Sequence, residues 1–202
     1  MEGHRSMTDW TSLKYVVVDV EGNGQQPPDL VELAAVPVVA GIIGEPTNWL
    51  VKPDEPITPF ARRIHGITNE QVADAPLFAD IKDEVLAALE GAVLVAHNAH
   101  VDVGVLQRKL DGWECPEVFD TLKLARRLLP KQSSYRLGTL VANFFLDKGI
   151  PEGLAPHRAT YDALVAARLF IQLTQDHGTT RSLEELRNQP SRGDEDDELS
   201  LF

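Results

Sequence analysis

Several residue types that define protein classes are scarce or missing in this sequence. Cys115 is the one cysteine among 202 residues, which excludes an internal disulfide and a cysteine-rich zinc site and fits a reducing, cytoplasmic location. The sequence contains no uninterrupted apolar run of about eighteen residues, so we expect no membrane-spanning helix. Its first ten residues lack the apolar core of a secretory signal peptide, so we expect none.

Positive charge is also scarce. The chain has 19 Lys and Arg residues against 31 Asp and Glu residues, and its net charge of −12 argues against a broad basic surface for nucleic acid. Five of the acids fall in Arg192–Glu198, "RGDEDDE", a composition typical of a solvated, disordered linker. The other acids lie mostly in the body of the chain, where some could be carboxylates that need cations.

Apolar residues make up 43% of the chain, enough for one domain with a hydrophobic core. Strands are predicted at 12–20, 29–41, 47–53, 92–97 and 117–120. Helices are predicted at 77–91, 100–112, 121–129, 134–146 and 159–175. The first three strands should form an antiparallel meander, and strand–helix alternation follows them. We therefore expect an α/β fold, a mixed five-stranded sheet flanked by helices.

Two capping boxes indicate further short helices: Thr68 with Gln71, and Ser182 with Glu185. Apolar density falls after about residue 177. We expect residues 1–12 to be a flexible N-terminus and 13–176 to be the main domain. Residues 177–202 should hold a short helix, the acidic linker and an apolar end.

Two acids end the first predicted strand, "VVVDVEGNG". Asp19 and Glu21 are two residues apart, so they share a face of that strand. They lie at its C-terminal end, where open α/β sheets place their ligands. Two adjacent carboxylates repel each other and favour a divalent cation such as Mg²⁺ or Mn²⁺. Taken alone, the same pattern also fits a turn with two solvated acids.

Two later segments favour the metal site. "VLVAHNAHVDVGVL" runs from strand into helix and places Asp102 in the first helical turns. "PHRATYDALVAARL" puts His157 before a helix and Asp162 inside its first turns. Four acids and one histidine are the residues that two-metal phosphodiester hydrolysis uses, with the histidine as base for the attacking water.

Three segments, "VDVEGNG", "HNAHVD" and "HRATYDA", resemble the three exonuclease motifs of the DnaQ-like, or DEDDh, 3′–5′ exonucleases. This family includes the proofreading (epsilon) subunit of bacterial DNA polymerase III, ribonuclease T and oligoribonuclease. "RIHGITNEQVADAP" and "FDTLKLARRLLP" match two further stretches common in the proofreading branch, which the chain resembles most closely. The resemblance runs from about Tyr15 to Leu173. It implies a ribonuclease H-like fold and an exonuclease domain at 13–176.

The resemblance also implies roles for the five residues. Asp19 would bridge two divalent cations, Mg²⁺ or Mn²⁺; Glu21 and Asp162 would complete the tighter site. Asp102 would hold the second cation, and His157 would be the general base. The histidine stands five residues before the final aspartate, which indicates the histidine subtype rather than the subtype with a tyrosine four residues before it.

The first motif departs from the family pattern. Gly22 and Asn23 replace two threonines that contact the terminal nucleotide, although main-chain N–H groups at Gly22–Gly24 could still approach it. The resemblance implies further nucleotide contacts by His65 and Asn98. His65 could equally be a loop residue before a capped helix, and Asn98 could satisfy loop backbone groups.

The last five residues, "ELSLF", resemble the bacterial sliding-clamp-binding pentapeptide. Leu199, Leu201 and Phe202 would be its apolar anchors, while Glu198 replaces the usual glutamine. An apolar end on a flexible tail can dock on a partner. It can also fold back onto its own domain or have no role.

These features predict a two-metal 3′–5′ exonuclease that releases nucleoside monophosphates from single-stranded DNA 3′ ends, with a tether to the sliding clamp. One alternative is an RNA-processing exoribonuclease of the same family. Another is a non-catalytic module that binds nucleic-acid ends or adapts the clamp. The cations Arg126, Arg127, Lys131 and Arg136 could steer a nucleic-acid backbone or simply form a solvated helix face.

Overall fold

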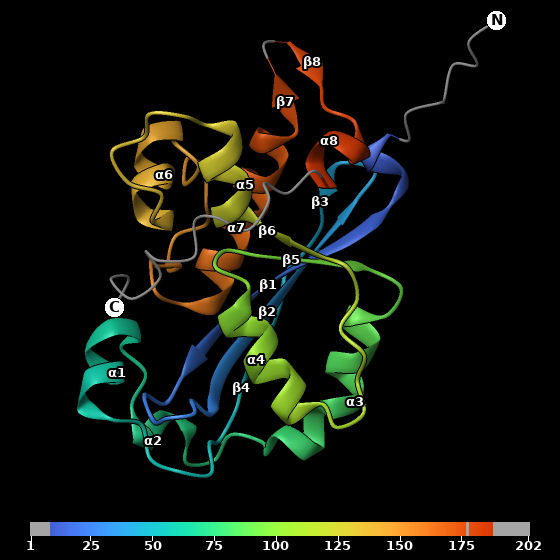
Figure 1. Cartoon of the computed structure of the whole chain (residues 1–202). Coiled ribbons are helices and arrows are strands. Elements are labelled where there is room, and N and C mark those ends of the chain that lie inside the picture. Colours follow the sequence, from blue (N-terminus) through green and yellow to red (C-terminus); the bar gives the residue numbers. More distant parts are fainter. Residues whose placement is uncertain (1–8, 177, 188–202) are drawn as a thin grey trace, which may run out of the picture.

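The computed structural model of the protein describes residues 9–176 and 178–187. The acidic linker and the motif residues Leu199, Leu201 and Phe202 lie outside this range. Within it, a mixed sheet lies between helices on both of its faces, as Figure 1 shows. None of the helices in the described part of the chain has the length and apolarity that a bilayer span requires.

The sheet follows the predicted order. Its strands are β1 (Lys14–Gly22), β2 (Leu30–Val39), β3 (Ile42–Ile43), β4 (Thr47–Leu50), β5 (Val93–Ala96) and β6 (Val118–Asp120). β2 pairs antiparallel with β1, β3 and β4, and β5 pairs parallel with β1 and β6. The predicted mixed sheet is confirmed, but it has six strands rather than five. The additional strand, β3, lies between the second and third predicted strands.

Eight α-helices lie in the described part of the chain. They are α1 (Pro59–His65), α2 (Asn69–Val72), α3 (Phe78–Leu89), α4 (His100–Lys109), α5 (Thr121–Leu128), α6 (Leu137–Phe144), α7 (Ala159–Leu173) and α8 (Leu183–Arg187). Both capping boxes are present, at the starts of α2 and α8. α1 was not predicted, although Thr58 caps it, Pro59 begins it and Gly66 ends it in the left-handed conformation.

The described C-terminal part adds a small hairpin. Strands β7 (Gln175–Asp176) and β8 (Thr179–Thr180) pair antiparallel between α7 and α8. Trp10 belongs to the segment predicted to be a flexible N-terminus, but it is buried, with its ring against Tyr15 and Phe170. Residues 9–12 therefore belong to the folded body, because a buried tryptophan contributes a large apolar surface to the core.

The alternation of β1 divides the core into two layers. Tyr15 and Val17 pack with residues of α5, α6 and α7, whereas Val16 and Val18 pack with residues of α3 and α4. Because side chains alternate along a strand, Asp19 continues the α7 side.

The C-terminal end of β1 extends past its parallel neighbour. β5 pairs only with Tyr15–Val17, through Val93–Val95. Residues 18–22 therefore have β2 on one side and no strand on the other. α4 follows β5 at this edge, and α1 lies beyond the end of β1 (Figure 1). This opening gives ligands access to the acids of β1.

Candidate active site

Three of the predicted acids come together at the open end of β1. Asp19 and Glu21 of β1 and Asp162 of α7 each offer a carboxylate oxygen, and these oxygens lie within 4.8 Å of one another. Asp162 reaches the strand because α7 packs on the face toward which Asp19 points. All three side chains are half-buried. A set of oxygen ligands at this spacing suits a hard divalent cation.

Asp102 lies beside this cluster rather than in it. It stands in the first turn of α4 and is buried. Its Oδ1 accepts a hydrogen bond from the main-chain N–H of Val20 at 3.0 Å. That N–H belongs to the part of β1 that β5 does not pair, so Asp102 satisfies an unpaired strand donor. Its second oxygen is left for another ligand.

The four carboxyl groups have raised pKa values. Burial is the main cause in each case, and other carboxylates of the site add to it for Asp19, Glu21 and Asp102. The pKa rises to about 9 for Glu21, about 8 for Asp102 and about 6 for Asp162. For Asp19 it lies well above its usual value. Divalent cations would remove this repulsion, so the donor set fits such ions.

His157 lies next to the acidic cluster and is exposed. Its main-chain N–H donates to Asp162 Oδ2 at 3.1 Å. The residue has a φ of 61°, in the left-handed region that non-glycine residues rarely adopt. Its backbone is therefore held beside a metal-ligand candidate, while its ring stays open to solvent.

An ion pair with a buried carboxylate, which the sequence does not predict, supports this segment. Glu32 of β2 is 2% exposed and stands opposite Glu21 in the β1–β2 register. Arg158 donates to it twice, through Nε at 3.0 Å and Nη2 at 2.6 Å, and the Ala159 N–H donates at 3.0 Å. Asn48 Nδ2 adds a fourth hydrogen bond at 3.2 Å. These contacts tie the residues after the histidine to the sheet.

The Gly-Asn-Gly segment forms a loop that contacts within the protein hold in place. Asn23 is fully buried: its Oδ1 accepts from the N–H groups of Gln25 and Asp29, and its Nδ2 donates to Glu55 O. A Cβ on Gly24 would overlap Thr58 Oγ1 at the start of α1. The loop is thus packed directly against α1, and the Asn23 side chain already has partners within the protein.

His65 is also used within the protein. It is buried at the end of α1, where Nδ1 accepts from the Ile67 N–H at 3.0 Å. Nε2 is therefore the protonated nitrogen and donates to Gly22 O at 3.2 Å. Burial is the main cause that lowers the pKa of His65, so the ring is neutral. Its clearest role is to hold the loop that follows Glu21.

Asn98 follows β5 at the same edge of the sheet. Its φ is 66°, and its N–H donates to Asp120 Oδ1 at 3.1 Å, while the Ala99 N–H donates to Oδ2 at 3.1 Å. Asp120 also caps α5 through the Leu122 N–H. Its charge helps to raise the pKa of Asp102, so the starts of α4 and α5 meet beside the acidic site.

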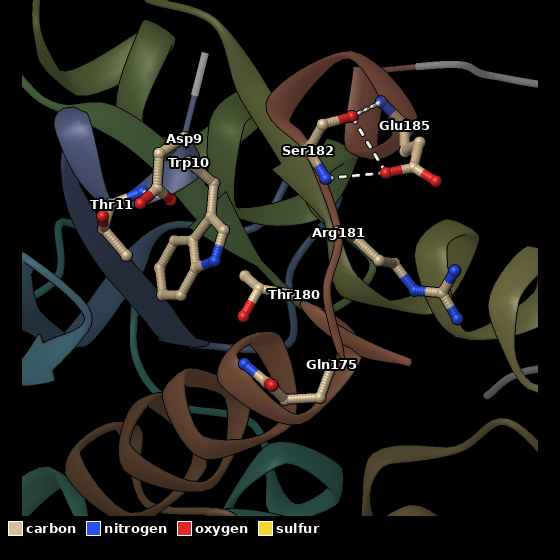
Figure 2. A pocket seen from close by; sticks show the side chains of 8 residues that line it. All are labelled: Asp9, Trp10, Thr11, Gln175, Thr180, Arg181, Ser182 and Glu185. Carbon is tan, nitrogen blue, oxygen red and sulfur yellow. Dashed lines mark hydrogen bonds between the residues drawn. The ribbon is translucent and has the colours of Figure 1, made fainter. Parts of the chain in front are cut away.

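A separate pocket of about 410 Å³ lies at the opposite end of β1, between the N-terminal turn, the β7–β8 hairpin and α8 (Figure 2). Several of its polar groups have partners within the fold. Asp9 caps the N-terminal turn, Glu185 accepts two bonds from Ser182, and Arg181 pairs with Asp176. Because it lies at the opposite end of β1 from Asp19 and Glu21, the pocket is remote from the predicted chemistry. Its lining residues are Asp9, Trp10, Thr11, Gln175, Thr180, Arg181, Ser182 and Glu185.

Comparison with known proteins gives consistent matches. The RNase_T family model, described as "Exonuclease", matches residues 16–170. Exodeoxyribonuclease 10 of Escherichia coli (strain K12) is 37% identical over 176 residues, which are 87% of this chain and 76% of that protein. The 3′-5′ exonuclease DinG of Bacillus subtilis (strain 168) is 33% identical over 169 residues, which are 80% of this chain but only 18% of that protein.

A solved structure matches over a similar range. Exonuclease X, in complex with 5′ overhanging duplex DNA, superposes with a TM-score of 0.69 and 34% identity. The match covers 85% of this chain and 98% of that one.

Proposed function

Because this chain belongs to the DnaQ-like exonuclease family, we propose that it removes nucleoside monophosphates from the 3′ ends of single-stranded DNA. The match to the family model over residues 16–170 confirms the predicted family and the predicted enzyme class, an exonuclease. The observation that carries the proposal is the convergence of Asp19, Glu21 and Asp162 beside His157.

The acidic residues provide the cation sites. Asp19, Glu21 and Asp162 would hold one divalent ion, and Asp19 with the second oxygen of Asp102 would hold another. Two divalent cations, Mg²⁺ or Mn²⁺, stabilise the attacking and leaving oxygens of a phosphodiester when bound in this way. The carboxylates must lose their protons to bind these ions, and their raised pKa values make ion binding pH-dependent.

His157 provides the base. Its ring is exposed, so an imidazole nitrogen can accept the proton of a water that attacks the terminal phosphodiester. The hydrogen bond from its main chain to Asp162 holds the backbone of His157 beside this ligand. Gly22–Gly24, His65 and Asn98 lie at or just after the ends of β1, α1 and β5, and we propose that they receive the terminal nucleotide.

DNA is the preferred substrate in this proposal, for two reasons. A 37% identical relative is named as an exodeoxyribonuclease, and a 34% identical protein has been solved in complex with DNA. That complex contains a duplex with a 5′ overhang, so the preference for a single strand over a recessed duplex end needs its own test. Matched DNA and RNA 20-mers, each single-stranded or recessed in a duplex, separate the four cases. Preferential RNA cleavage would instead favour the exoribonuclease alternative.

A labelled single strand with Mg²⁺ tests the mechanism. Wild-type protein should shorten a 5′-labelled strand one nucleotide at a time, and EDTA should stop it. Asp19→Ala and Asp162→Ala should abolish cleavage, whereas His157→Ala should leave slow, metal-dependent cleavage. Full activity of Asp19→Ala, or activity undiminished by EDTA, would refute the mechanism. Strand binding without cleavage by the wild type would favour a non-catalytic module.

The tether to a sliding clamp is a separate part of the proposal. It rests on the sequence "ELSLF", whose anchors Leu199, Leu201 and Phe202 follow an acidic run. Deletion of residues 198–202 should abolish binding to the bacterial clamp and leave cleavage of short oligonucleotides intact. Equal clamp affinity of the deleted and full-length chains would refute the tether. A clamp partner implies a cytoplasmic location, which the lone Cys115 also fits.

A further inference from the structure

A cation-rich segment lies at the same sheet edge as the acidic site. Residues 121–146 contain five Lys and Arg residues and no Asp or Glu. The segment therefore carries +5 in a chain whose net charge is −12, so the rest of the chain carries −17. Positive charge concentrated next to clustered carboxylates indicates a binding surface rather than a general contribution to solubility. Its cations are Lys123, Arg126, Arg127, Lys131 and Arg136.

One of the five cations has a structural role. Arg127 donates to the main-chain oxygens of Glu185 and Leu186 at 2.8 and 2.9 Å. It therefore fastens α5 to the end of α8 rather than serving an external ligand.

Contacts place three of these cations around the ends of β5 and β6. Lys123 is exposed in the first turn of α5, directly after β6, and Arg126 lies one turn further on. Burial is the main cause that lowers the pKa of His97, which follows β5, and the charge of Arg126 adds to it. His97 Nε2 also donates to Tyr135 O at 3.1 Å, which brings Arg136 to the same place. We call Lys123, Arg126 and Arg136 the basic rim.

The basic rim and the Gly-Asn-Gly loop border opposite sides of the acidic site. β1 stands between β2 and β5 in the sheet. The loop of Gly22–Gly24 follows the part of β1 that β2 pairs and β5 does not, and it lies against α1. The rim instead follows the ends of β5 and β6. A strand whose terminal nucleotide sits against the loop can therefore leave the site across the rim.

We propose that the basic rim binds phosphates of the substrate strand on the 5′ side of the terminal nucleotide. The ligand is a single-stranded polynucleotide backbone, since phosphate contacts by Lys and Arg position a strand without reading its bases. Neither Lys123 nor Arg126 forms an ion pair with another residue of the described chain. The inference rests on the proposed function and extends it to how a long strand is held.

The test compares substrates of different length at different salt concentrations. A rim variant, with Lys123→Gln, Arg126→Gln and Arg136→Gln combined, is assayed on dT20 and on the dinucleotide pTpT. Each phosphate contact to a single strand adds about 0.7 to the slope of log affinity against log salt. Loss of three contacts should reduce the slope for dT20 by about 2, or roughly 16-fold between 50 and 200 mM KCl. The advantage of dT20 over pTpT should fall accordingly.

A matched control removes the same charge elsewhere. Lys52→Gln, Lys82→Gln and Lys148→Gln combined lower the net charge equally but lie outside the rim. This variant should keep the wild-type salt slope and length preference. If the rim variant behaves like this control, the proposal is wrong, and an acidic protein partner becomes the better candidate for the rim. Lys123→Gln alone, at an exposed position, should show a slope change of about 0.7 even if the triple variant folds poorly.

Failure of the proposed function has a different signature. In that case the wild type cleaves neither substrate, and fluorescence anisotropy with labelled dT20 then tests the rim alone. Weaker binding by the rim variant than by the control variant would support the rim as a strand-binding surface. Equal binding by both variants would overturn it.

Discussion

The ion pair of Arg158 with the buried Glu32 should control both the stability of the protein and the position of His157, the proposed general base. Arg158→Met is the sharpest perturbation, because it removes the charge and keeps much of the side-chain length. It deletes two of the four hydrogen bonds that reach the Glu32 carboxylate, those at 3.0 and 2.6 Å. The Glu32 charge then stays buried with only two donors, from Ala159 and Asn48.

The expected loss of stability follows from the burial of the two side chains. Removal of one partner of a buried ion pair destabilises a protein by about 3–5 kcal/mol. The Glu32 side chain is 3% exposed but that of Arg158 is 41% exposed, so solvent screening places the loss near the low end, about 3 kcal/mol. The double variant Glu32→Gln with Arg158→Met removes the uncompensated charge and should regain at least half of that loss.

Urea unfolding followed by circular dichroism measures these differences. A loss below about 1 kcal/mol in Arg158→Met, or a double variant that loses the sum of the two single losses, would refute the reasoning. Arg158→Lys is the control that keeps the charge but lacks the two-pronged geometry, and it should fall between wild type and Arg158→Met.

Catalysis should respond to the same change. Arg158 is the residue after His157, so its loss frees the segment that carries the proposed base. A displacement of about 1 Å in such a group can reduce a rate about 100-fold. We expect kcat to fall by about 10- to 100-fold in Arg158→Met, with a smaller change in KM, since the residue orients the base rather than binds the strand. An unchanged kcat in a folded variant would show that the pair serves stability alone.

Three further predictions concern the site and its support. Without metal, the pKa values of about 9 for Glu21 and about 8 for Asp102 exceed the unfolded values of about 4, so the folded state binds more protons. The melting temperature in EDTA should therefore fall as pH rises from about 4 to about 9, and Mn²⁺ should raise it most at high pH. Gly24→Ala should destabilise the protein more than Gly66→Ala in urea unfolding. Both have positive φ, but only at Gly24 does a Cβ meet other atoms. Asp120→Ala leaves four main-chain N–H groups without their acceptor and should lower the free energy of unfolding by at least about 1 kcal/mol, whereas Asp120→Asn should lower it less.

The central strand and its acids could be predicted because period-2 alternation is a local property. Val16–Val18 indicated a buried strand, and the spacing of Asp19 and Glu21 put both on one face. Helix starts were equally local: the capping boxes at Thr68 and Ser182 depend on residues three positions apart. Such signals survive in the folded protein because tertiary packing does not compete with them.

Features that depend on distant partners could not be predicted. Glu32 stands in the apolar run "LVELAAV", where the unexplained feature was a single acid in a buried strand. Its partner Arg158 is 126 residues away in the sequence, so no local pattern links the two. An acid in a predicted buried strand nevertheless indicates that a distant partner exists, since buried carboxylates are almost always paired.

The prediction of two short elements failed for a different reason. β3 has two residues, Ile42–Ile43, and exists because they pair with Val38–Val39 across a tight turn. Two residues are too few for a periodic pattern. α1 was missed despite its capping residue, its first-turn proline and its final glycine. Its seven residues include exposed Phe60 and Ile64, which obscure the amphipathic period that indicates a helix.

The Gly22–Gly24 loop shows how a changed motif can keep its shape. Asn23 does not offer a free hydroxyl or amide to a nucleotide, because its side chain is buried and makes three hydrogen bonds within the protein. The loop is instead fixed at both of its glycines: Thr58 packs against Gly24, and His65 donates to Gly22 O. A loop fixed in this way presents its backbone without needing the substrate to order it. Any contact of this segment with a nucleotide then comes from the main chain of the two glycines, which does not distinguish one base from another. The Gly-Asn-Gly departure therefore favours an exonuclease that accepts any terminal base.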